Sequence, residues 1–360
     1  MLSQPLEKRM RRGTTNQPAS QPTTQRVTQQ TTQMVRETSS TESAQGLDLS
    51  VDLAPNNPHH LRLVNPVMIA SGTFGYDGYG RGITEDMDLG ELGAVVPKTF
   101  TPSPREGNPE PRWYPTSYRE AWDTGDILFL NAIGLTNPGI EAGLKDVTPG
   151  WDRWNATYIL SFASDSVEQF GEMAAIADKG TGYQAIELNL SCPNVADGSL
   201  FGHSASLTAQ AVAAVRANTD RPILAKLAPN VPNIVEIARA AVDGGADAIS
   251  LCNTMPAMHI DTQTRQTVLG NITGGLSGPG LRPISLALVY QVSKAVDVPI
   301  VGIGGIFSGE HAAEYILAGA SAVQIGSANL VGLNAPWRIL AELKDWMRLS
   351  GLSNLQGLSI

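Results

Sequence analysis

The segment 187–194, ELNLSCPN, places a thiol between two side-chain amides where an apolar run ends. Residues 185–191 are rich in strand formers and Pro193 blocks their continuation, so Cys192 lies at the C-terminal end of a predicted strand. Asn189 and Asn194 both donate and accept hydrogen bonds and could hold a flat polar ring while the thiol removes a proton. A cysteine taken alone is more often an inert buried side chain. The assignment therefore depends on the elements that position it.

Eight short apolar runs alternate with helix-like segments along the chain. Near-continuous apolar strands separated by helices indicate a parallel sheet covered by helices, and eight such units predict an α/β fold of the (β/α)₈ TIM-barrel type. A doubly wound open sheet is the alternative, but no GxGxxG motif follows the first run. The runs cover residues 66–71, 94–99, 156–162, 185–191, 222–228, 248–254, 299–305 and 322–328, and the helical patterns cover 165–179, 206–218, 233–243, 283–296, 308–317 and 337–349.

Two connections, 101–155 and 255–298, are too long to be single helices and are rich in glycine and proline. They follow the second and sixth predicted strands. Long loops of this kind usually cover a functional face, which in a barrel is the face at the C-terminal ends of the strands. We therefore expect both connections to cap that face.

Small or polar residues end nearly every predicted strand. Lys98 and Lys226 are the most informative, because an ammonium group is rarely buried unless an anion meets it. The alternative for each lysine is a side chain that extends from the barrel mouth into water. Together with the asparagines and the cysteine, the two lysines predict a flat, anionic ligand. The strand-end residues are Ser71, Lys98, Thr99, Ser161, Asn189, Cys192, Lys226, Asn253, Thr254, Gly304, Gly305, Gly326 and Ser327.

The glycines indicate where a phosphate group would bind. Gly304 and Gly305 end the seventh strand and Gly326 ends the eighth, which lets backbone N–H groups approach an anion closely. Barrels commonly hold phosphate after these two strands, although tight barrel turns also favour glycine. The segment 272–279, ITGGLSGP, adds a lip that contains Gly278. These groups together suit a phosphate-bearing flavin with Lys226 near its electron-accepting ring.

Composition excludes several classes of function. The chain has 360 residues, a formal net charge of −9, two cysteines and no long apolar stretch, so we expect a protein of the reducing cytoplasm without a membrane span. Two cysteines cannot hold an iron–sulfur cluster, and the histidines lie in no metal-binding motif, so no metal is predicted. The acidic balance argues against nucleic acid as a partner.

Residues 1–46 differ from the rest in composition. They are rich in Gln, Thr and Ser with few large apolar residues, so they are predicted to be disordered, and the catalytic barrel is predicted to span 47–360. Their arginines also resemble a transit peptide, although no amphipathic apolar face accompanies them. A start at Met10 or Met34 is a further alternative.

The order of motifs from about residue 47 to the end resembles class 1 dihydroorotate dehydrogenases. The combination of NAIGLTNPG with ITGGLSGP is more similar to class 1B, whose catalytic chain works with a second subunit, than to the fumarate-using class 1A. The resemblance implies oxidation of (S)-dihydroorotate to orotate in pyrimidine (UMP) biosynthesis. The matching motifs are IASG at 69–72, KT at 98–99, REGNP at 105–109, PR at 111–112, NAIGL at 131–135, ELNLSCPN at 187–194, KLAPN at 226–230, NT at 253–254, ITGGLSGP at 272–279 and GG at 304–305.

The same resemblance implies roles for individual residues. Cys192 would be the base that removes a proton from the substrate ring while hydride passes from the neighbouring carbon to flavin mononucleotide (FMN). Lys226 would stabilise negative charge on the reduced flavin. Dihydroorotate would be bound by Lys98, Asn131, Ala132, Ile133, Gly134, Leu135, Asn189, Asn194, Asn253 and Thr254. FMN would be held by Ala70, Ser71, Lys98, Thr99, Ser161, Asn189, Lys226, Cys252, Gly278, Gly304, Gly305, Gly326 and Ser327.

A partner subunit is also expected. The chain has neither a dinucleotide motif nor ligands for a cluster, so electrons that end on NAD must pass through another polypeptide. The resemblance to class 1B implies that this partner carries FAD and a [2Fe-2S] centre. A homodimeric core is expected because twofold pairs are the commonest oligomers.

The chain departs from the class 1B pattern in three places. Ser161 stands where the pattern has an asparagine, residues 113–130 form an aromatic-rich insertion that could be a modified lid or a partner surface, and the tail is foreign to the pattern. Alternative functions are a class 1A enzyme, a dihydropyrimidine dehydrogenase, a tRNA dihydrouridine synthase, to which the acidic body is poorly suited, and an inactive flavin-binding scaffold.

Overall fold

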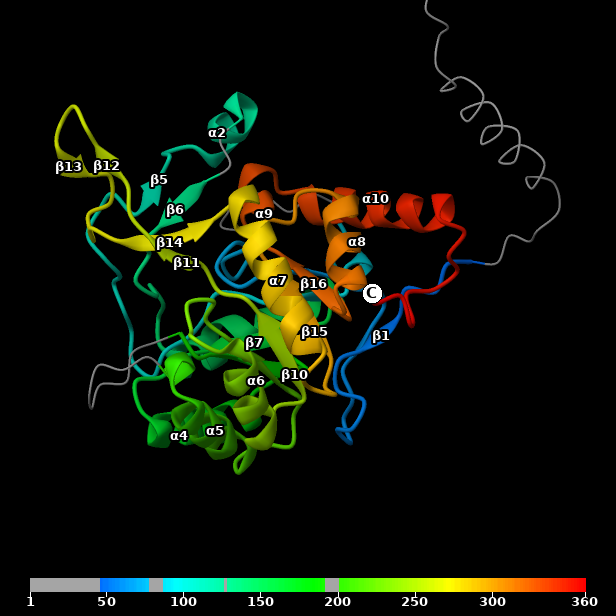
Figure 1. The fold of residues 1–360 in the computed structure, drawn as a ribbon. Helices are drawn as coiled ribbons and strands as arrows, with labels where there is room; N and C mark the ends of the chain where they lie inside the picture. Colours follow the sequence, from blue (N-terminus) through cyan, green and yellow to red (C-terminus); the bar gives the residue numbers. More distant parts are fainter. Residues whose placement is uncertain (1–45, 78–86, 126–127, 192–200) are drawn as a thin grey trace, which may run out of the picture. The chain divides into compact units, whose positions relative to one another are not determined.

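The computed structural model describes residues 46–77, 87–125, 128–191 and 201–360, of which Leu47–Ile360 form one compact unit (Figure 1). Residues 1–45 of the predicted disordered tail lie outside the described residues, so the disorder stays a prediction. Within the described ranges, no helix combines the length and apolar character needed to cross a membrane.

Eight parallel strands form the barrel. The two end strands are joined at Val95, which bridges Tyr158 in parallel and whose backbone N–H donates to the Thr157 carbonyl at 2.8 Å. Each neighbouring pair is parallel and the circuit closes, so the prediction of a (β/α)₈ barrel is confirmed. The order around the barrel is β4 (Ala94–Val95), β3 (Val67–Ile69), β16 (Ala322–Ile325), β15 (Ile300–Ile303), β10 (Ala248–Leu251), β9 (Ile223–Lys226), β8 (Ala185–Asn189) and β7 (Ile159–Phe162).

The helices cover the outside of the barrel. Four of them begin at a Ser or Asn whose side chain accepts a hydrogen bond from the backbone N–H three residues on, which explains why the sequence starts helices there. Of the helices around the barrel, the sequence prediction did not include the short α9, and it placed residues 327–328 at the end of a strand, because five residues carry too little periodicity to identify a helix. The helices are α4 (Val167–Asp178), α5 (Ala205–Arg216), α6 (Ile234–Asp243), α7 (Arg282–Ser293), α8 (Gly309–Leu317), α9 (Ser327–Val331) and α10 (Ala335–Leu349).

The barrel interior changes from apolar to polar along the strands. At the N-terminal ends an apolar floor, which includes Met68, Leu224 and Val301, packs on the hairpin of β1 (Val51–Asp52) and β2 (Arg62–Leu63). Lys226 follows Leu224 by two residues on the same face of β9, and both Lys226 and Glu187 of β8 are buried. The floor therefore separates a buried polar layer from solvent at the N-terminal end.

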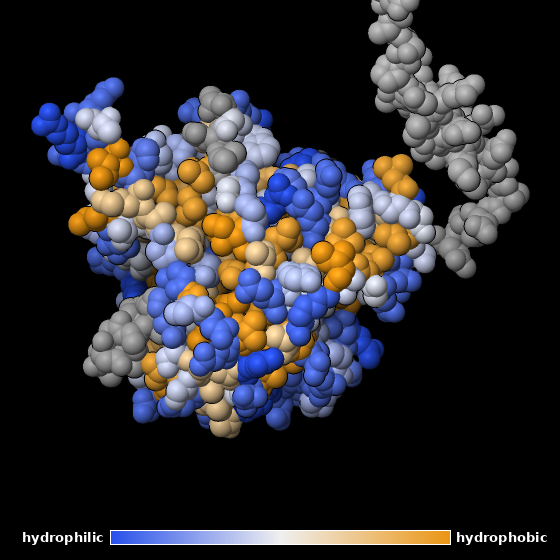
Figure 2. All heavy atoms as spheres, in the orientation of Figure 1, coloured by the Kyte–Doolittle hydropathy of each residue, from blue (hydrophilic) through white to orange (hydrophobic). Residues whose placement is uncertain are grey.

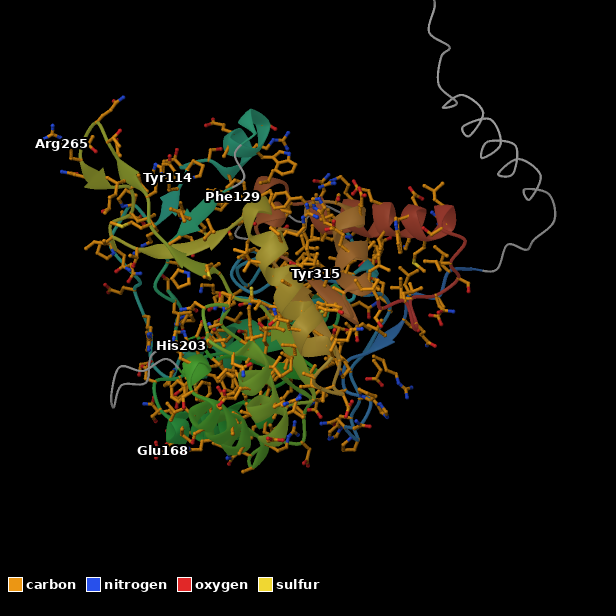
Figure 3. All side chains as sticks on the ribbon, in the orientation of Figure 1. Tyr114, Phe129, Glu168, His203, Arg265 and Tyr315 are labelled. Atoms are coloured by element: carbon orange, nitrogen blue, oxygen red, sulfur yellow. The ribbon has the colours of Figure 1, made fainter. Side chains whose placement is uncertain are left out.

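The two long connections pair with each other. They contribute an antiparallel sheet in the order β11 (Met255–Ala257), β14 (Gly274–Ser277), β6 (Phe129–Asn131) and β5 (Trp113–Tyr114), beyond which the hairpin of β12 (Ile260–Asp261) and β13 (Gln266–Thr267) extends (Figure 1). Figure 3 shows Arg265 at the tip of this hairpin. Predicted only as capping loops, these segments are a second sheet beside the strand C-termini.

The insertion at 113–130 is attached by aromatic stacking. Tyr118 of α2 (Tyr118–Thr124) stacks on Phe129 at a centroid distance of 4.4 Å and donates its hydroxyl to the Leu130 carbonyl at 2.7 Å. Trp122 stacks on Phe307, which follows β15, at 4.5 Å. The Tyr118 contacts hold the insertion together, and the Trp122–Phe307 stack joins it to the barrel. The remaining short elements are η1 (Leu89–Glu91), α3 (Ile140–Ala142), η2 (Gly143–Val147), η3 (Thr148–Trp154), η4 (Phe201–His203) and η5 (Pro279–Leu281).

The outer surface is chemically mixed. Figure 2 shows hydrophilic and hydrophobic residues side by side, with hydrophobic ones gathered around the position of α7. Ile284 and Tyr290 of this helix are 41% and 42% exposed. Exposed apolar side chains are common on folded domains, so this surface by itself identifies no function.

Candidate active site

A pocket of about 760 Å³ lies at the C-terminal ends of the barrel strands and is bordered by the second sheet. Residues at the ends of every barrel strand except β7 line it, together with Asn131 of β6 and Gly275 of β14. A concave site of this size suits a cofactor or small substrate. The barrel and the paired connections therefore create one cavity from distant parts of the chain.

The structure brings most of the predicted site residues together. Gly278 does not line the cavity, but its N–H donates to the hydroxyl of Ser327 at 3.1 Å. Cys192 and Asn194 lie outside the described residues, so their predicted roles stay predictions. The predicted residues that line the cavity are Ala70, Ser71, Lys98, Thr99, Asn131, Ala132, Ile133, Gly134, Leu135, Asn189, Lys226, Cys252, Asn253, Thr254, Gly304, Gly305, Gly326 and Ser327.

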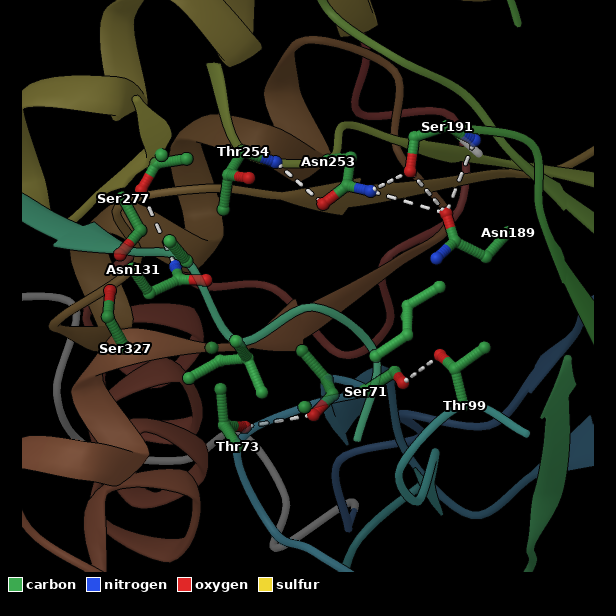
Figure 4. Close-up of a pocket in the computed structure, with 18 of the residues that line it drawn as sticks. Ser71, Thr73, Thr99, Asn131, Asn189, Ser191, Asn253, Thr254, Ser277 and Ser327 are labelled. Carbon is green, nitrogen blue, oxygen red and sulfur yellow. Dashed lines mark hydrogen bonds between the residues drawn. The ribbon is translucent and has the colours of Figure 1, made fainter. Parts of the chain in front are cut away.

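Ser161 of β7 stands behind the cavity wall. Its hydroxyl is 2.9 Å from that of Thr99, which is 3.0 Å from that of Ser71, and Ser71 donates to the Pro97 carbonyl at 2.9 Å. Each hydroxyl has one proton, and that of Ser71 is used on the Pro97 carbonyl. Thr99 must therefore donate to Ser71, and Ser161 to Thr99. Figure 4 shows the Ser71–Thr99 contact at the cavity. Ser161 thus fixes Thr99, and Thr99 and Ser71 line the cavity in its place.

A network of amides and hydroxyls forms the opposite wall (Figure 4). The Asn253 amide donates to Ser191 at 2.5 Å and to the side-chain oxygen of Asn189 at 3.3 Å, and Ser191 donates to that same oxygen at 2.6 Å. The Thr254 N–H donates to the Asn253 oxygen at 2.8 Å. Because the oxygens of both amides are used as acceptors, their orientations are determined by the network. Such a wall can present fixed donors to a polar ring.

Sequence reasoning did not assign several residues that line the cavity. Ser191 is the clearest, since it lies in the ELNLSCPN motif and is the last described residue before Cys192. Arg105 and Asn108 belong to the matching motif REGNP, which was a signal that went unused. Asn271 and Thr273 come from the sixth connection. Their positions depend on the pairing of the two long connections.

Lys226 meets a buried carboxylate at the bottom of the cavity. Its ammonium nitrogen is 3.5 Å from one oxygen of Glu187, and the two side chains are 8% and 0% exposed. The other Glu187 oxygen accepts hydrogen bonds from Ser250 at 3.1 Å and from Gln324 at 2.6 Å. Lys226 therefore lines the cavity as a cation with its counter-ion on the side of the barrel core.

Cys252 lines the same cavity but is 2% exposed. Burial raises the pKa of its thiol to about 11, although the Ser285 hydroxyl and the Lys226 ammonium act in the opposite direction. The thiol is therefore neutral at physiological pH. A neutral thiol is a poor nucleophile and a poor base.

We expect Cys252 to be unreactive in the folded protein. In a Cys192→Ala variant, where it is the single thiol, labelling with a thiol reagent at pH 8 should be at least about tenfold slower than in urea, because only the thiolate reacts. The rate of chromophore release measures this. Equal rates in native and unfolded protein would contradict the burial of this side chain.

Comparisons with known proteins identify the family of the chain. A family model described as dihydroorotate dehydrogenase matches residues 53–347. Dihydroorotate dehydrogenase B (NAD(+)), catalytic subunit, from Pelobacter propionicus is 44% identical over 312 residues, which covers 86% of this chain and 97% of the relative. The proteins of the same name from Desulforudis audaxviator and Geobacter metallireducens are 44% and 43% identical, covering 83% and 86% of this chain and 94% and 97% of the relatives. The predicted resemblance is confirmed, and the chain belongs to the dihydroorotate dehydrogenase family.

Proposed function

We propose that this chain is the catalytic subunit of a class 1B dihydroorotate dehydrogenase and oxidises dihydroorotate to orotate in pyrimidine biosynthesis. The observation that carries the proposal is the single cavity in which the ordered family motifs converge, in a chain 41–44% identical to proteins named as such subunits. The fixed amides of Asn189 and Asn253 suit a substrate with amide and carboxylate edges, because a mispaired buried edge would be left unsatisfied.

We infer that FMN binds in this cavity. Membership of the family implies a flavin, and the residues fit FMN: Lys226 is a buried cation on the cavity wall, and Gly304 and Gly305 adopt positive φ values of 131° and 65°. At Gly326 an added Cβ would approach only Ala70, at 3.9 Å, so this wall leaves space for a ligand. A flavin bound here supplies a two-electron acceptor beside the substrate.

The residues of the chain would then bind, orient and deprotonate the substrate. Lys98 and the 131–135 loop line the cavity and would bind dihydroorotate together with Asn189, Asn253 and Thr254. Cys192, which follows the cavity residue Ser191, would remove the proton from the ring carbon beside the carbonyl. Lys226 would stabilise negative charge that develops on the reduced cofactor.

The proposal includes a second subunit. The relatives are named as NAD(+)-type catalytic subunits, and this chain has two cysteines, too few for a cluster. We propose that an FAD and [2Fe-2S] subunit carries electrons from this chain to NAD, and that two copies of the chain form the core of the assembly.

Anaerobic reduction tests the function. When dihydroorotate is mixed by hand with the purified chain under nitrogen, the flavin absorbance should be bleached by the first reading. NAD alone should not reoxidise the reduced flavin. Bleaching by dihydrouracil in place of dihydroorotate would favour a dihydropyrimidine dehydrogenase, rapid reoxidation by fumarate would favour class 1A, and no bleaching by either substrate would favour an inactive scaffold.

Substitutions at two glycines should distinguish an effect on FMN binding from an effect on stability. Gly326→Ala should leave the unfolding temperature within about 2 °C of the wild type but weaken FMN binding about tenfold, because its methyl group would enter the cavity. Gly305→Ala should destabilise the chain itself, since its Cβ would lie 2.7 Å from the Arg282 Cβ at a φ of 65°. FMN titration and thermal unfolding of the apoprotein measure the two effects. Equal FMN affinity in Gly326→Ala and wild type would contradict the assignment of this wall.

A further inference from the structure

We propose that Glu187 is a positioning residue that holds the Lys226 ammonium at the cavity and sets the electron affinity of the flavin bound there. The inference rests on the proposed function, because it requires FMN in this cavity. It concerns a buried carboxylate to which neither the sequence motifs nor the proposed chemistry gives a role.

The two oxygens of Glu187 have different surroundings. One accepts hydrogen bonds from Ser250 of β10 and Gln324 of β16, at 3.1 and 2.6 Å. The other accepts no hydrogen bond from any described residue and lies 3.5 Å from the Lys226 ammonium. Two strands thus hold the carboxylate in place by one oxygen, which leaves the other directed to the cation.

Burial of the Glu187 carboxylate costs free energy unless Lys226 balances its charge. Glu187 is fully buried and its register partner on β9 is Leu224, a member of the apolar floor. An isolated buried charge is strongly unfavourable, and among the described residues the Lys226 ammonium is its ion-pair partner. A neutral side chain could fill this volume without that cost. The carboxylate is therefore best explained by its effect on Lys226.

The positions of Glu187 and Lys226 relative to the cavity determine how the carboxylate acts on a bound ligand. Lys226 lines the cavity, whereas Glu187 does not, so the cation stands between the carboxylate and any bound molecule. Reduction of a flavin adds negative charge, which Lys226 attracts and Glu187 repels. The carboxylate thereby fixes the direction of the ammonium and offsets part of its field. It should favour the oxidised over the reduced cofactor relative to a neutral residue.

Glu187→Gln tests this inference, since it removes the charge and keeps the shape. With the full chain and FMN, we expect reduced FMN to gain affinity relative to oxidised FMN by about tenfold, equivalent to about 30 mV in a two-electron midpoint potential. Dye-equilibrated reductive titration gives the potential, and titration of the apoprotein with FMN gives the affinity for the oxidised form. Thermal unfolding of each apoprotein verifies the fold.

The matched control removes a carboxylate from an ion pair at the other end of the barrel. Asp247 precedes β10 and is 2.7 Å from Arg216, and Asp247→Asn should leave the ratio of the two affinities unchanged. Glu187→Asp keeps the negative charge but moves it away from Lys226 by one methylene group. The midpoint potential of bound FMN should therefore rise less in Glu187→Asp than in Glu187→Gln. If Glu187→Gln does not accumulate as folded protein, the potential measured for Glu187→Asp tests the inference instead.

The outcomes are distinguishable. A folded Glu187 variant with an unchanged or lowered potential would overturn the role of Glu187, even if it unfolds at a lower temperature, because a merely structural residue changes stability alone. An equal shift in Asp247→Asn would also overturn it. If the wild-type chain binds no FMN, the proposed function fails and takes this inference with it.

Discussion

Replacement of Cys192 by alanine is expected to slow the reduction of the bound flavin by dihydroorotate by about 10²- to 10⁴-fold, the range typical for loss of a general base. The thiol is the group that the ELNLSCPN motif places after the cavity residues Asn189 and Ser191. No other cysteine can replace it, because burial raises the pKa of Cys252 to about 11. Stopped-flow mixing under nitrogen measures the rate of bleaching at 450 nm.

The pH dependence of the bleaching rate distinguishes the loss of a base from general damage to the site. A free thiol has a pKa of about 8.5, and the thiolate is the active form, so the wild-type rate should rise with pH until the thiol is ionised. In Cys192→Ser the rise should continue to higher pH, because a hydroxyl is a weaker acid than a thiol. FMN content should match the wild type in both variants. Bleaching at wild-type speed in Cys192→Ala would remove the cysteine from the mechanism.

The second large effect is on stability. Lys226→Met should lower the free energy of unfolding of the apoprotein by about 3–5 kcal/mol, because it leaves the fully buried Glu187 carboxylate without its counter-ion. Glu187→Gln should cost less, since Lys226 lines the cavity and can be hydrated there once FMN is removed. Urea denaturation followed by circular dichroism gives both values.

A double variant separates the ion pair from packing. Lys226→Met combined with Glu187→Gln should recover much of the loss, because no buried charge then lacks a partner. As a control, Arg348→Met removes the exposed pair with Asp345, in which the side chains are 60% and 68% exposed, and should cost about 0–1 kcal/mol. If the double variant is as unstable as Lys226→Met, the loss comes from lysine packing and the buried ion pair is not its cause.

Much of the architecture could be predicted because barrel strands carry a local signal. A strand that is buried on both faces must be apolar along its length, so each of the eight runs was visible, and the polar residue that ends it marks the face where ligands bind. Lys98, Asn189 and Asn253 could therefore be assigned to one site before their distances were known, and all three line the same cavity.

Contacts between distant segments could not be predicted in the same way. The second sheet pairs Asn131 with Gly275, and nothing local in either connection specifies a partner so far along the chain. The same holds for Ser161, whose family position suggested a direct contact with flavin, whereas its hydroxyl bonds to Thr99 behind the cavity wall.

The sequence by itself determined the eight strands, the end of the barrel that carries the site and the family, because these depend on residue types at fixed local spacing. Only the tertiary structure decided which inward side chains meet. Glu187 reads in the sequence as one polar residue in an apolar run, and closure of the barrel with its strand register brings it to Lys226, Ser250 and Gln324. The physical reason is that a buried charge is tolerated only where neighbouring strands supply its partners.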